Sequence, residues 1–353
     1  MWPRQNKTRK RFLPYFWVGL ALLSLACRIG SPSVADATLP PATAAPSRTV
    51  FQPTATLTAT ASPTPASPTV TPSPTMTPRP TAKRVLIISV DGLRPDAIAL
   101  APMPNLLALM QAGAYTLSAQ TNFPSVTLPS HASMLTGLCP AQTGVDWNDY
   151  LPQRGFAKGT SLFALAKQAG LHTVMMVGKK KLRQITPPET TDVFQFINDR
   201  DVVLADQAAP TLEKGFDLAF VHLATTDDMG HAYGWLSPQQ ISVIIRADEA
   251  IGTFLAALDQ ADLRKDTLIL VTADHGGHQQ THGSKMPEDM TIPWMINGPG
   301  VVPQVLTQPI NTTDTAATAA WALHLAMPAE AVGRPILEAF GERPGVRLAP
   351  RCP

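Results

Sequence analysis

The stretch Arg84-Val85-Leu86-Ile87-Ile88-Ser89-Val90-Asp91-Gly92 decides the fold of this chain. Residues 85–90 are apolar except for one serine, and four of them are β-branched. A short apolar run of this kind, with no polar alternation, is typical of a parallel strand that is buried on both faces of a sheet. The run ends at an aspartate and a glycine. We therefore expect a carboxylate at the carboxyl end of a central strand.

Similar segments recur along the 353 residues and alternate with helical patterns. Further strands are expected at 172–177, 216–223 and 267–272, and helices at 104–112, 161–168 and 238–258. This alternation predicts an α/β fold, with a mostly parallel central sheet and helices on both of its faces. Towards the C-terminus we expect a strand at 291–296, where Pro293 suits an edge position, and a helix at 314–327.

Charge divides the chain into two parts. Residues 1–83 hold 9 Lys/Arg and one acidic residue, whereas residues 84–353 hold 19 basic and 25 acidic residues. The second part is mildly acidic, which argues against a nucleic-acid-binding domain. It is long enough for one domain with a sizeable core, and the domain is expected to span residues 84–353.

The N-terminus has the pattern of an export signal. Five cations within residues 1–11 precede 15 uncharged, mostly apolar residues at 12–26, which is shorter than the roughly 20 residues of a membrane-spanning helix. Residues 1–27 therefore read as a signal peptide. Its end, Ala26-Cys27, resembles a bacterial lipobox, in which the cysteine becomes the lipidated N-terminus, although Ser24 stands where an aliphatic residue is commoner. The alternative is a short N-terminal membrane anchor. Both interpretations place the rest of the chain outside the cell membrane and tethered to it.

Residues 28–83 are rich in Thr, Pro, Ser and Ala and show no hydrophobic period. Such a segment buries too little apolar area to offset its chain entropy, so we expect a disordered linker.

Three of the expected strands lead to carboxylates. Asp91 follows the first strand, Asp227 lies shortly after the strand at 216–223, and Asp274 follows the strand at 267–272. Open α/β sheets bind ligands outside the carboxyl ends of their strands, so these side chains are expected to converge.

Histidines accompany two of these carboxylates. The candidate ligands are Asp91, Asp227, His231, Asp274, His275 and His282. Carboxylate oxygens and imidazole nitrogens are suitable ligands for zinc and related divalent ions, and six ligands suffice for two metals with open positions. Two such ions would outweigh three carboxylates in charge, which favours an anionic substrate such as a phosphate.

The segment from Asn122 to Gly137 contains a candidate nucleophile. Pro129 suits the first turn of a helix, which places Thr127 just before the helix N-terminus, where free N–H groups favour a phosphate. A threonine hydroxyl is a weak nucleophile until a metal or a base activates it.

Together these motifs resemble the alkaline phosphatase superfamily, and within it the nucleotide pyrophosphatase/phosphodiesterase branch. The matching pieces occur in the family's order: Val90-Asp91-Gly92, Phe123-Pro124 through Gly137, Asp227-x-x-Gly230-His231, and Asp274-His275-Gly276. The resemblance implies metal-dependent hydrolysis of phosphodiester or pyrophosphate bonds in a small phosphate ester, with two zinc ions.

The resemblance also implies individual roles. Asp227, His231 and His282 would hold one metal, with His278 as the competitor for the last position. Asp91, Asp274 and His275 would hold the other metal. Thr127 would coordinate beside this second metal and attack phosphorus, forming a phosphothreonine that water then hydrolyses. Asn148 would donate to a phosphate oxygen.

Two alternatives stay open at this point. A phosphomonoesterase or phosphotransferase on the same scaffold would need an Arg or Lys close to Thr127, and none lies in residues 116–150, which favours diesters. A non-catalytic envelope-binding protein would be expected to lack some ligands, and none is missing. A sulfatase is disfavoured, because Cys139-Pro140-Ala141-Gln142 lacks that family's arginine.

Other features allow two interpretations each. Lys179-Lys180-Lys181 is either a phosphate contact or a solvated turn, and Trp147 and Tyr150 either stack on a planar group or pack at a rim. Cys139 and Cys352 would be able to pair in an exported protein, but the sequence does not set their distance. It does not indicate an oligomeric state either.

Overall fold

The structure, a computed structural model, describes residues 82–343 and Cys352. The predicted signal peptide, residues 1–27, lies outside the described residues, as does the predicted linker except for its last two residues. Among the helices of the described part, none has both the length and the apolar character needed to span a bilayer.

The described residues form an eight-stranded sheet with the order β4-β3-β5-β1-β6-β7-β2-β8. The strands are β1 (Arg84–Val90), β2 (Ala114–Gln120), β3 (Thr173–Val177), β4 (Val193–Phe196), β5 (Leu218–Leu223), β6 (Thr267–Thr272), β7 (Thr291–Asn297) and β8 (Gln304–Val305). Strand β1 lies between β5 and β6 and runs parallel to both, with Ile87 opposite Phe220 and Leu270. The predicted mostly parallel α/β sheet is confirmed.

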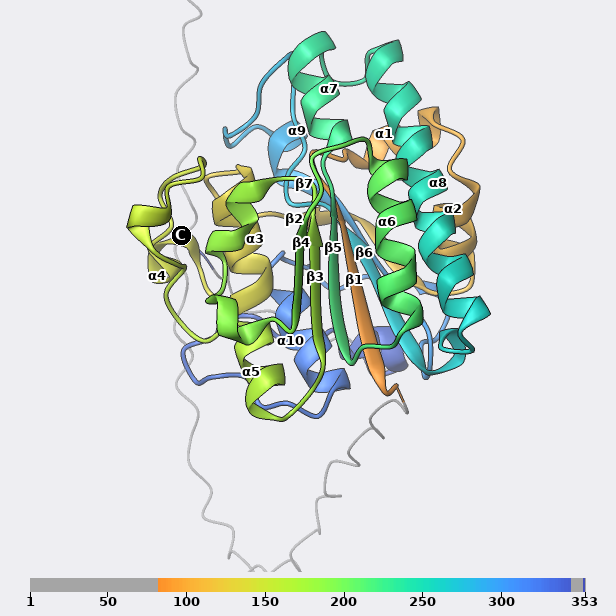
Figure 1. The fold of residues 1–353 in the computed structure, drawn as a ribbon. Coiled ribbons are helices and arrows are strands. Elements are labelled where there is room, and N and C mark those ends of the chain that lie inside the picture. Colours follow the sequence, from red (N-terminus) through yellow and green to blue (C-terminus); the bar gives the residue numbers. More distant parts are fainter. Residues whose placement is uncertain (1–81, 344–351, 353) are drawn as a thin grey trace, which may run out of the picture. The chain divides into compact units, whose positions relative to one another are not determined.

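Helices cover both faces of this sheet. They are α1 (Pro95–Leu100), α2 (Pro104–Gln111), α3 (Thr127–Thr136), α4 (Pro140–Thr143), α5 (Leu162–Gln168), α6 (Asp201–Glu213), α7 (Thr225–Tyr233), α8 (Pro238–Gln260), α9 (Pro287–Met290) and α10 (Asp314–Ala322). Helices α2, α6 and α8 lie on one face, and α3, α5 and α10 lie on the other (Figure 1). The described residues also contain short 3-10 helices: η1 (Pro152–Arg154), η2 (Lys180–Gln184), η3 (Pro188–Thr190), η4 (Arg264–Asp266) and η5 (Leu337–Phe340).

Strand β7 differs from the prediction, because it is antiparallel and lies inside the sheet between β6 and β2. The edge position expected from Pro293 is therefore wrong. The register of β2 shifts between Thr116, which faces Trp294, and Ala119, which faces Ile292. Pro293 thus lies opposite a β-bulge, where its missing N–H interrupts no regular ladder.

The C-terminal helix is shorter than the expected 314–327. Helix α10 ends at Ala322, and His324 has a φ of +59°. This left-handed conformation cannot continue a right-handed helix.

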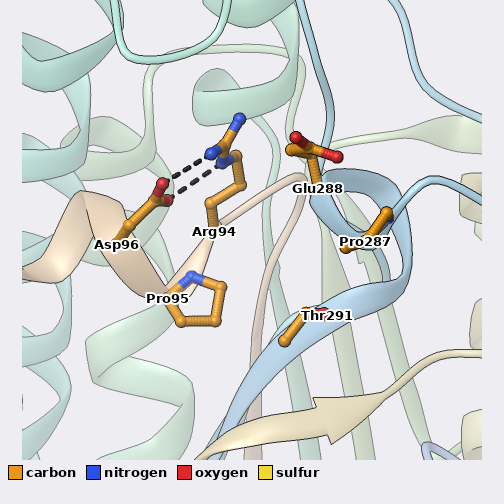
Figure 2. Close-up of a pocket in the computed structure, with 6 residues that line it drawn as sticks. All are labelled: Arg94, Pro95, Asp96, Pro287, Glu288 and Thr291. Atoms are coloured by element: carbon orange, nitrogen blue, oxygen red, sulfur yellow. Dashed lines mark hydrogen bonds and ion pairs between the residues drawn. The ribbon is translucent and has the colours of Figure 1, made fainter.

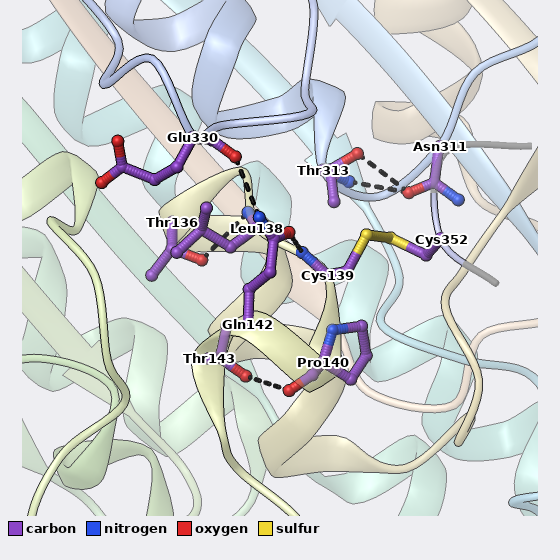
Figure 3. Close-up of a disulfide and its surroundings, with 10 residues drawn as sticks. All are labelled: Thr136, Leu138, Cys139, Pro140, Gln142, Thr143, Asn311, Thr313, Glu330 and Cys352. Carbon is purple, nitrogen blue, oxygen red and sulfur yellow. Dashed lines mark hydrogen bonds between the residues drawn. A yellow bond between two sulfur atoms is a disulfide. The ribbon is translucent and has the colours of Figure 1, made fainter.

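The fold brings Cys139 and Cys352 together. Cys139, at the N-cap of α4, forms a disulfide with Cys352, with 5.4 Å between their Cα atoms (Figure 3). The bond joins residues 213 positions apart in sequence and fastens Cys352 beside α4.

Candidate metal centre and active site

The site lies where four parallel strands end. Asp91 directly follows β1, and Asp274 follows β6 after one alanine. Asp227 lies in the first turn of α7, which begins two residues after β5, and Lys179 lies two residues after β3. Since β3, β5, β1 and β6 are neighbours in the sheet, their carboxyl ends meet at one edge. The topology therefore brings side chains together that are up to 183 residues apart.

Two groups of potential ligands share one histidine. Ligand atoms within 4.8 Å of one another come from Asp227, His275 and His282, and from Asp91, Asp274 and His275. His231 joins the first group, with its Nε2 atom 3.5 Å from Asp227 Oδ1 and 3.1 Å from His282 Nε2. All six ligands suggested by the sequence thus lie in one cluster.

The three imidazoles of the cluster are oriented by backbone carbonyls. The Nδ1 atoms of His231, His275 and His282 lie 2.9, 2.7 and 2.9 Å from the carbonyl oxygens of Gln280, Gly276 and Ser125. An Nδ1–H group that donates to a carbonyl leaves Nε2 as an unprotonated acceptor, which is the arrangement found in histidines that bind metals.

The carboxylates facing these nitrogens have unpaired oxygens. Asp91 Oδ1, Asp227 Oδ1 and Asp274 Oδ2 are buried and accept no hydrogen bond from a described residue. His275 Nε2 lies 3.3 Å from the Asp91 and Asp274 oxygens, and His282 Nε2 lies 3.5 Å from the Asp227 oxygen. Buried lone pairs that face one another repel unless a cation lies between them. The donor set therefore fits divalent metal ions.

The electrostatics of the buried groups agree with this fit. Burial lowers the pKa of His275, and burial together with the neighbouring His275 lowers the pKa of His282 to about 4. Both rings are thus neutral near pH 7, the state in which imidazole binds a metal. Burial and then the charge of Asp91 raise the pKa of Asp274 well above its usual range. A bound cation would relieve this repulsion between carboxylates.

Lys179 belongs to the site, which the sequence interpretation left open. Its Nζ atom lies 2.7 Å from Asp91 Oδ2 and 2.5 Å from Asp227 Oδ2, and its side chain is 13% exposed. Burial would lower the pKa of Lys179, but the charges of Asp91 and Asp227 outweigh it and raise that pKa above its usual value. Lys179 therefore contacts the Oδ2 atoms of Asp91 and Asp227, and the Oδ1 atoms of both carboxylates face the imidazoles.

Thr127 lies at the N-terminus of α3. It is the first residue of this helix, one position further in than predicted, and it is fully buried. Its Oγ1 atom lies 3.5 Å from His275 Nε2, beside the second ligand group. Asn148 Oδ1 accepts from the backbone N–H of Leu128 at 2.9 Å, so Asn148 is fixed next to Thr127.

His278 lies outside both ligand groups. Its Nδ1 atom is 2.7 Å from Asp289 Oδ1, and Asp289 Oδ2 accepts from the backbone N–H of Ser284 at 2.8 Å. This contact orients the loop that precedes α9. Of the two competing histidines, His282 is the one that lies among the ligands.

Two more buried histidines support the ligands and were not singled out from the sequence. His222 Nε2 lies 2.9 Å from Asp91 Oδ2, and His131 Nδ1 lies 2.8 Å from the carbonyl oxygen of Thr127 and 3.3 Å from Asp274 Oδ2. His222 sits inside β5, and His131 lies four residues after Thr127. The only signal in the sequence for His222 was a histidine within an otherwise apolar strand segment.

The two aromatic side chains near Asn148 already have cationic neighbours. The guanidinium of Arg154 lies 4.2 Å from the ring centroid of Trp147, and Lys180 Nζ lies 4.7 Å from that of Tyr150. Trp147 also packs against the core.

A separate cavity of about 250 Å³ lies beside the loop that carries His278. Figure 2 shows its lining residues, which are Arg94, Pro95, Asp96, Pro287, Glu288 and Thr291. Arg94 pairs with Asp96 across two contacts and donates to the carbonyl oxygen of Gly277 at 3.0 Å. Arg94 is thus held against the backbone at Gly277, close to the candidate ligand His275. None of the candidate metal ligands lines this cavity.

Comparisons with known proteins agree with the geometry. An uncharacterized pyrophosphatase/phosphodiesterase of Schizosaccharomyces pombe is 26% identical over 215 residues, which cover 54% of this chain and 44% of that protein. Human ectonucleotide pyrophosphatase/phosphodiesterase family member 5 is 25% identical over 214 residues, or 55% of this chain and 45% of that protein. The chain therefore spans less than half the length of these relatives.

A solved structure shares the fold. The murine ectonucleotide pyrophosphatase/phosphodiesterase 5 superimposes with a TM-score of 0.62 at 16% identity, and the match covers 73% of this chain and 99% of that one. Residues 85–288, well over half of the chain, match the family described as type I phosphodiesterase / nucleotide pyrophosphatase. This protein belongs to the type I phosphodiesterase/nucleotide pyrophosphatase family.

Proposed function

We propose that the protein hydrolyses phosphodiester or pyrophosphate bonds of a small phosphate ester, through Thr127 at a site for two divalent metal ions. One observation carries the proposal. Three buried carboxylate oxygens without a hydrogen-bond donor face the Nε2 atoms of the candidate histidine ligands, and the hydroxyl of Thr127 lies 3.5 Å from Nε2 of His275. The family membership supports the same chemistry.

The ligands divide between two ions. Asp227, His231 and His282 would hold one, and Asp91, Asp274 and His275 would hold the other. Carboxylate oxygens and imidazole nitrogens form a donor set that zinc accepts. When bound, the ions supply a positive charge that stabilises a phosphate and lowers the pKa of a nearby hydroxyl.

The chain's own residues position the reacting groups. Thr127 presents its hydroxyl at the start of α3, where the free N–H groups of the first turn favour a phosphate. The Thr127 hydroxyl would lose its proton to solvent, and its Oγ1 atom would form a bond to phosphorus while the bond from phosphorus to the leaving oxygen breaks. Water would then cleave the phosphothreonine and release the phosphate product. Asn148 would donate its amide N–H to a phosphate oxygen, because its Oδ1 atom is engaged by the Leu128 N–H.

The domain would work outside the cell membrane. Residues 1–27 act as the signal peptide, with Cys27 as a lipidated anchor, residues 28–83 form the linker, and residues 84–353 form the catalytic domain. The disulfide between Cys139 and Cys352 supports an oxidising compartment, since disulfides persist mainly in exported proteins.

The test is hydrolysis of bis(p-nitrophenyl) phosphate by the purified protein loaded with zinc, with and without a chelator. The proposal expects turnover that the chelator abolishes and that added zinc restores. Absence of metal-dependent turnover would instead favour a non-catalytic envelope-binding protein.

A further inference from the structure

A second lysine from the Lys179-Lys180-Lys181 run lies close to the nucleophile. Lys181, in the 3-10 turn η2, places its Nζ atom 3.1 Å from Asn148 Oδ1. The same oxygen accepts from the backbone N–H of Leu128, the residue after Thr127. Lys181 thus contacts Asn148, the neighbour of the nucleophile, from a segment more than 50 residues away from Thr127 in the sequence.

Lys181 has no carboxylate within ion-pair distance among the described residues. Its neighbour Lys179, by contrast, contacts two carboxylates. An ammonium has three donors, and the Asn148 oxygen occupies one of them. Burial, and then the nearby charge of Lys179, lower the pKa of Lys181. This lowering is offset only in part by the charges of Asp91, Asp227 and Asp274. A partly buried cation without an anionic partner is unfavourable until a ligand supplies the anion.

Resting on the proposed function, we propose that Lys181 binds a non-bridging oxygen of the substrate's phosphate and fits the site to a terminal phosphate group. A phosphate monoester has three non-bridging oxygens and a second negative charge, whereas a diester has two such oxygens and a neutral ester arm in place of the third. A cation fixed beside Asn148 gains more from the additional oxyanion than from an ester oxygen.

The position of Lys181 changes the substrate preference expected from the sequence. The absence of Arg and Lys from residues 116–150 favours diesters only if the phosphate is contacted by that segment alone. The fold brings a lysine to the same place from η2, so a terminal phosphate is within the range of substrates.

The test compares two substrates with the same leaving group, p-nitrophenyl phosphate and methyl p-nitrophenyl phosphate, which differ by one methyl group on a phosphate oxygen. The variant Lys181→Gln is expected to lower kcat/KM for the monoester by about 10- to 100-fold, the loss of one hydrogen bond to a charged group. The loss for the methyl diester is expected to stay below about threefold. Inorganic phosphate should inhibit the variant more weakly, and Lys181→Arg should restore part of the monoester activity.

The matched control is Lys180→Gln, which removes the same charge one residue away from an exposed side chain over Tyr150. Equal losses on both substrates, or the same selectivity in Lys180→Gln, would overturn the inference while leaving the proposed function intact. A wild-type protein that cleaves only the diester would overturn it as well. A wild-type protein inactive on both substrates with zinc present would overturn the proposed function and the inference with it. Metal content and the unfolding midpoint of each variant show whether the fold is retained.

Discussion

The ammonium of Lys179 lies 2.7 Å from Oδ2 of Asp91, and this contact joins the ends of two strands that are not adjacent in the sheet. The same ammonium contacts Asp227, so one cation links the two ligand groups. In each carboxylate, Oδ2 contacts the lysine and Oδ1 faces an imidazole. Lys179 is therefore placed to position the carboxylates of both candidate ligand groups.

Replacing Lys179 should weaken the site in a way that depends on metal. In metal-free protein, Lys179→Met leaves two buried carboxylates without their cation, and we expect a loss of about 3–5 kcal/mol in the free energy of unfolding. Bound zinc should restore much of this stability. The variant should bind zinc about 10- to 100-fold more weakly than the wild type does. Urea denaturation with chelator and with zinc measures both effects. The control Lys265→Met removes an exposed lysine that pairs with Asp262. A similar loss with and without zinc would contradict the positioning role.

The stability of the metal-free protein should depend on pH through its buried histidines. The pKa of His282 in the folded protein is about 4, below the usual value of 6.5, because burial and His275 disfavour the charged ring. As pH falls below 6.5, the unfolded chain takes up a proton that the folded chain does not. The contribution of His282 to stability is therefore present above pH 6.5 and is lost towards pH 4, by up to about 1.4 kcal/mol per pH unit.

Urea denaturation of the protein in the presence of chelator at pH 7.5, 6.0 and 5.0 measures the slope of the free energy of unfolding against pH. His282→Gln should show a shallower slope than the wild type, because one shifted group is removed while His131, His222 and His275, whose pKa values burial also lowers, remain. Identical slopes in the two proteins would show that His282 titrates normally.

Metal content should distinguish the two competing histidines. His282→Ala is expected to lower the zinc bound per chain from about two to about one, because a ligand is removed from the Asp227 group. His278→Ala should keep both ions and lose about 1–2 kcal/mol of stability with its bond to Asp289. Elemental analysis after gel filtration measures the stoichiometry. The reverse result would exchange the roles of the two residues.

The main strands of this fold could be predicted from the sequence, because each one is a short apolar run that is recognisable by itself. The apolar run at 85–90 predicts β1, and strand ends in a parallel sheet predict where Asp91 and Asp274 meet. Strands β2 and β4 and helix α6 were not predicted. In strand β2, buried and exposed residues do not alternate regularly. Helix α6 contains Pro210, which interrupts the helical sequence pattern. Their conformation is set by packing against neighbours rather than by local preference.

The supporting side chains of the site depend on distances that no local pattern contains. Three lysines after a strand have the composition of a solvated turn, yet the end of β3 lies beside β5 and brings Lys179 to Asp227. His222 looks like an ordinary strand residue until β1 is placed next to β5. Metal ligands carry a recognisable residue type and spacing, whereas groups that orient them are defined only by the tertiary fold.

The proposed function requires Thr127 to attack phosphorus at a two-metal site. The most direct test measures zinc content and hydrolysis of bis(p-nitrophenyl) phosphate for the wild type and for Thr127→Ala side by side. We expect about two zinc ions per chain and an unchanged unfolding midpoint in both proteins, with turnover lowered at least about 1,000-fold in the variant. A variant that binds zinc fully and turns over at the wild-type rate would contradict the proposed function.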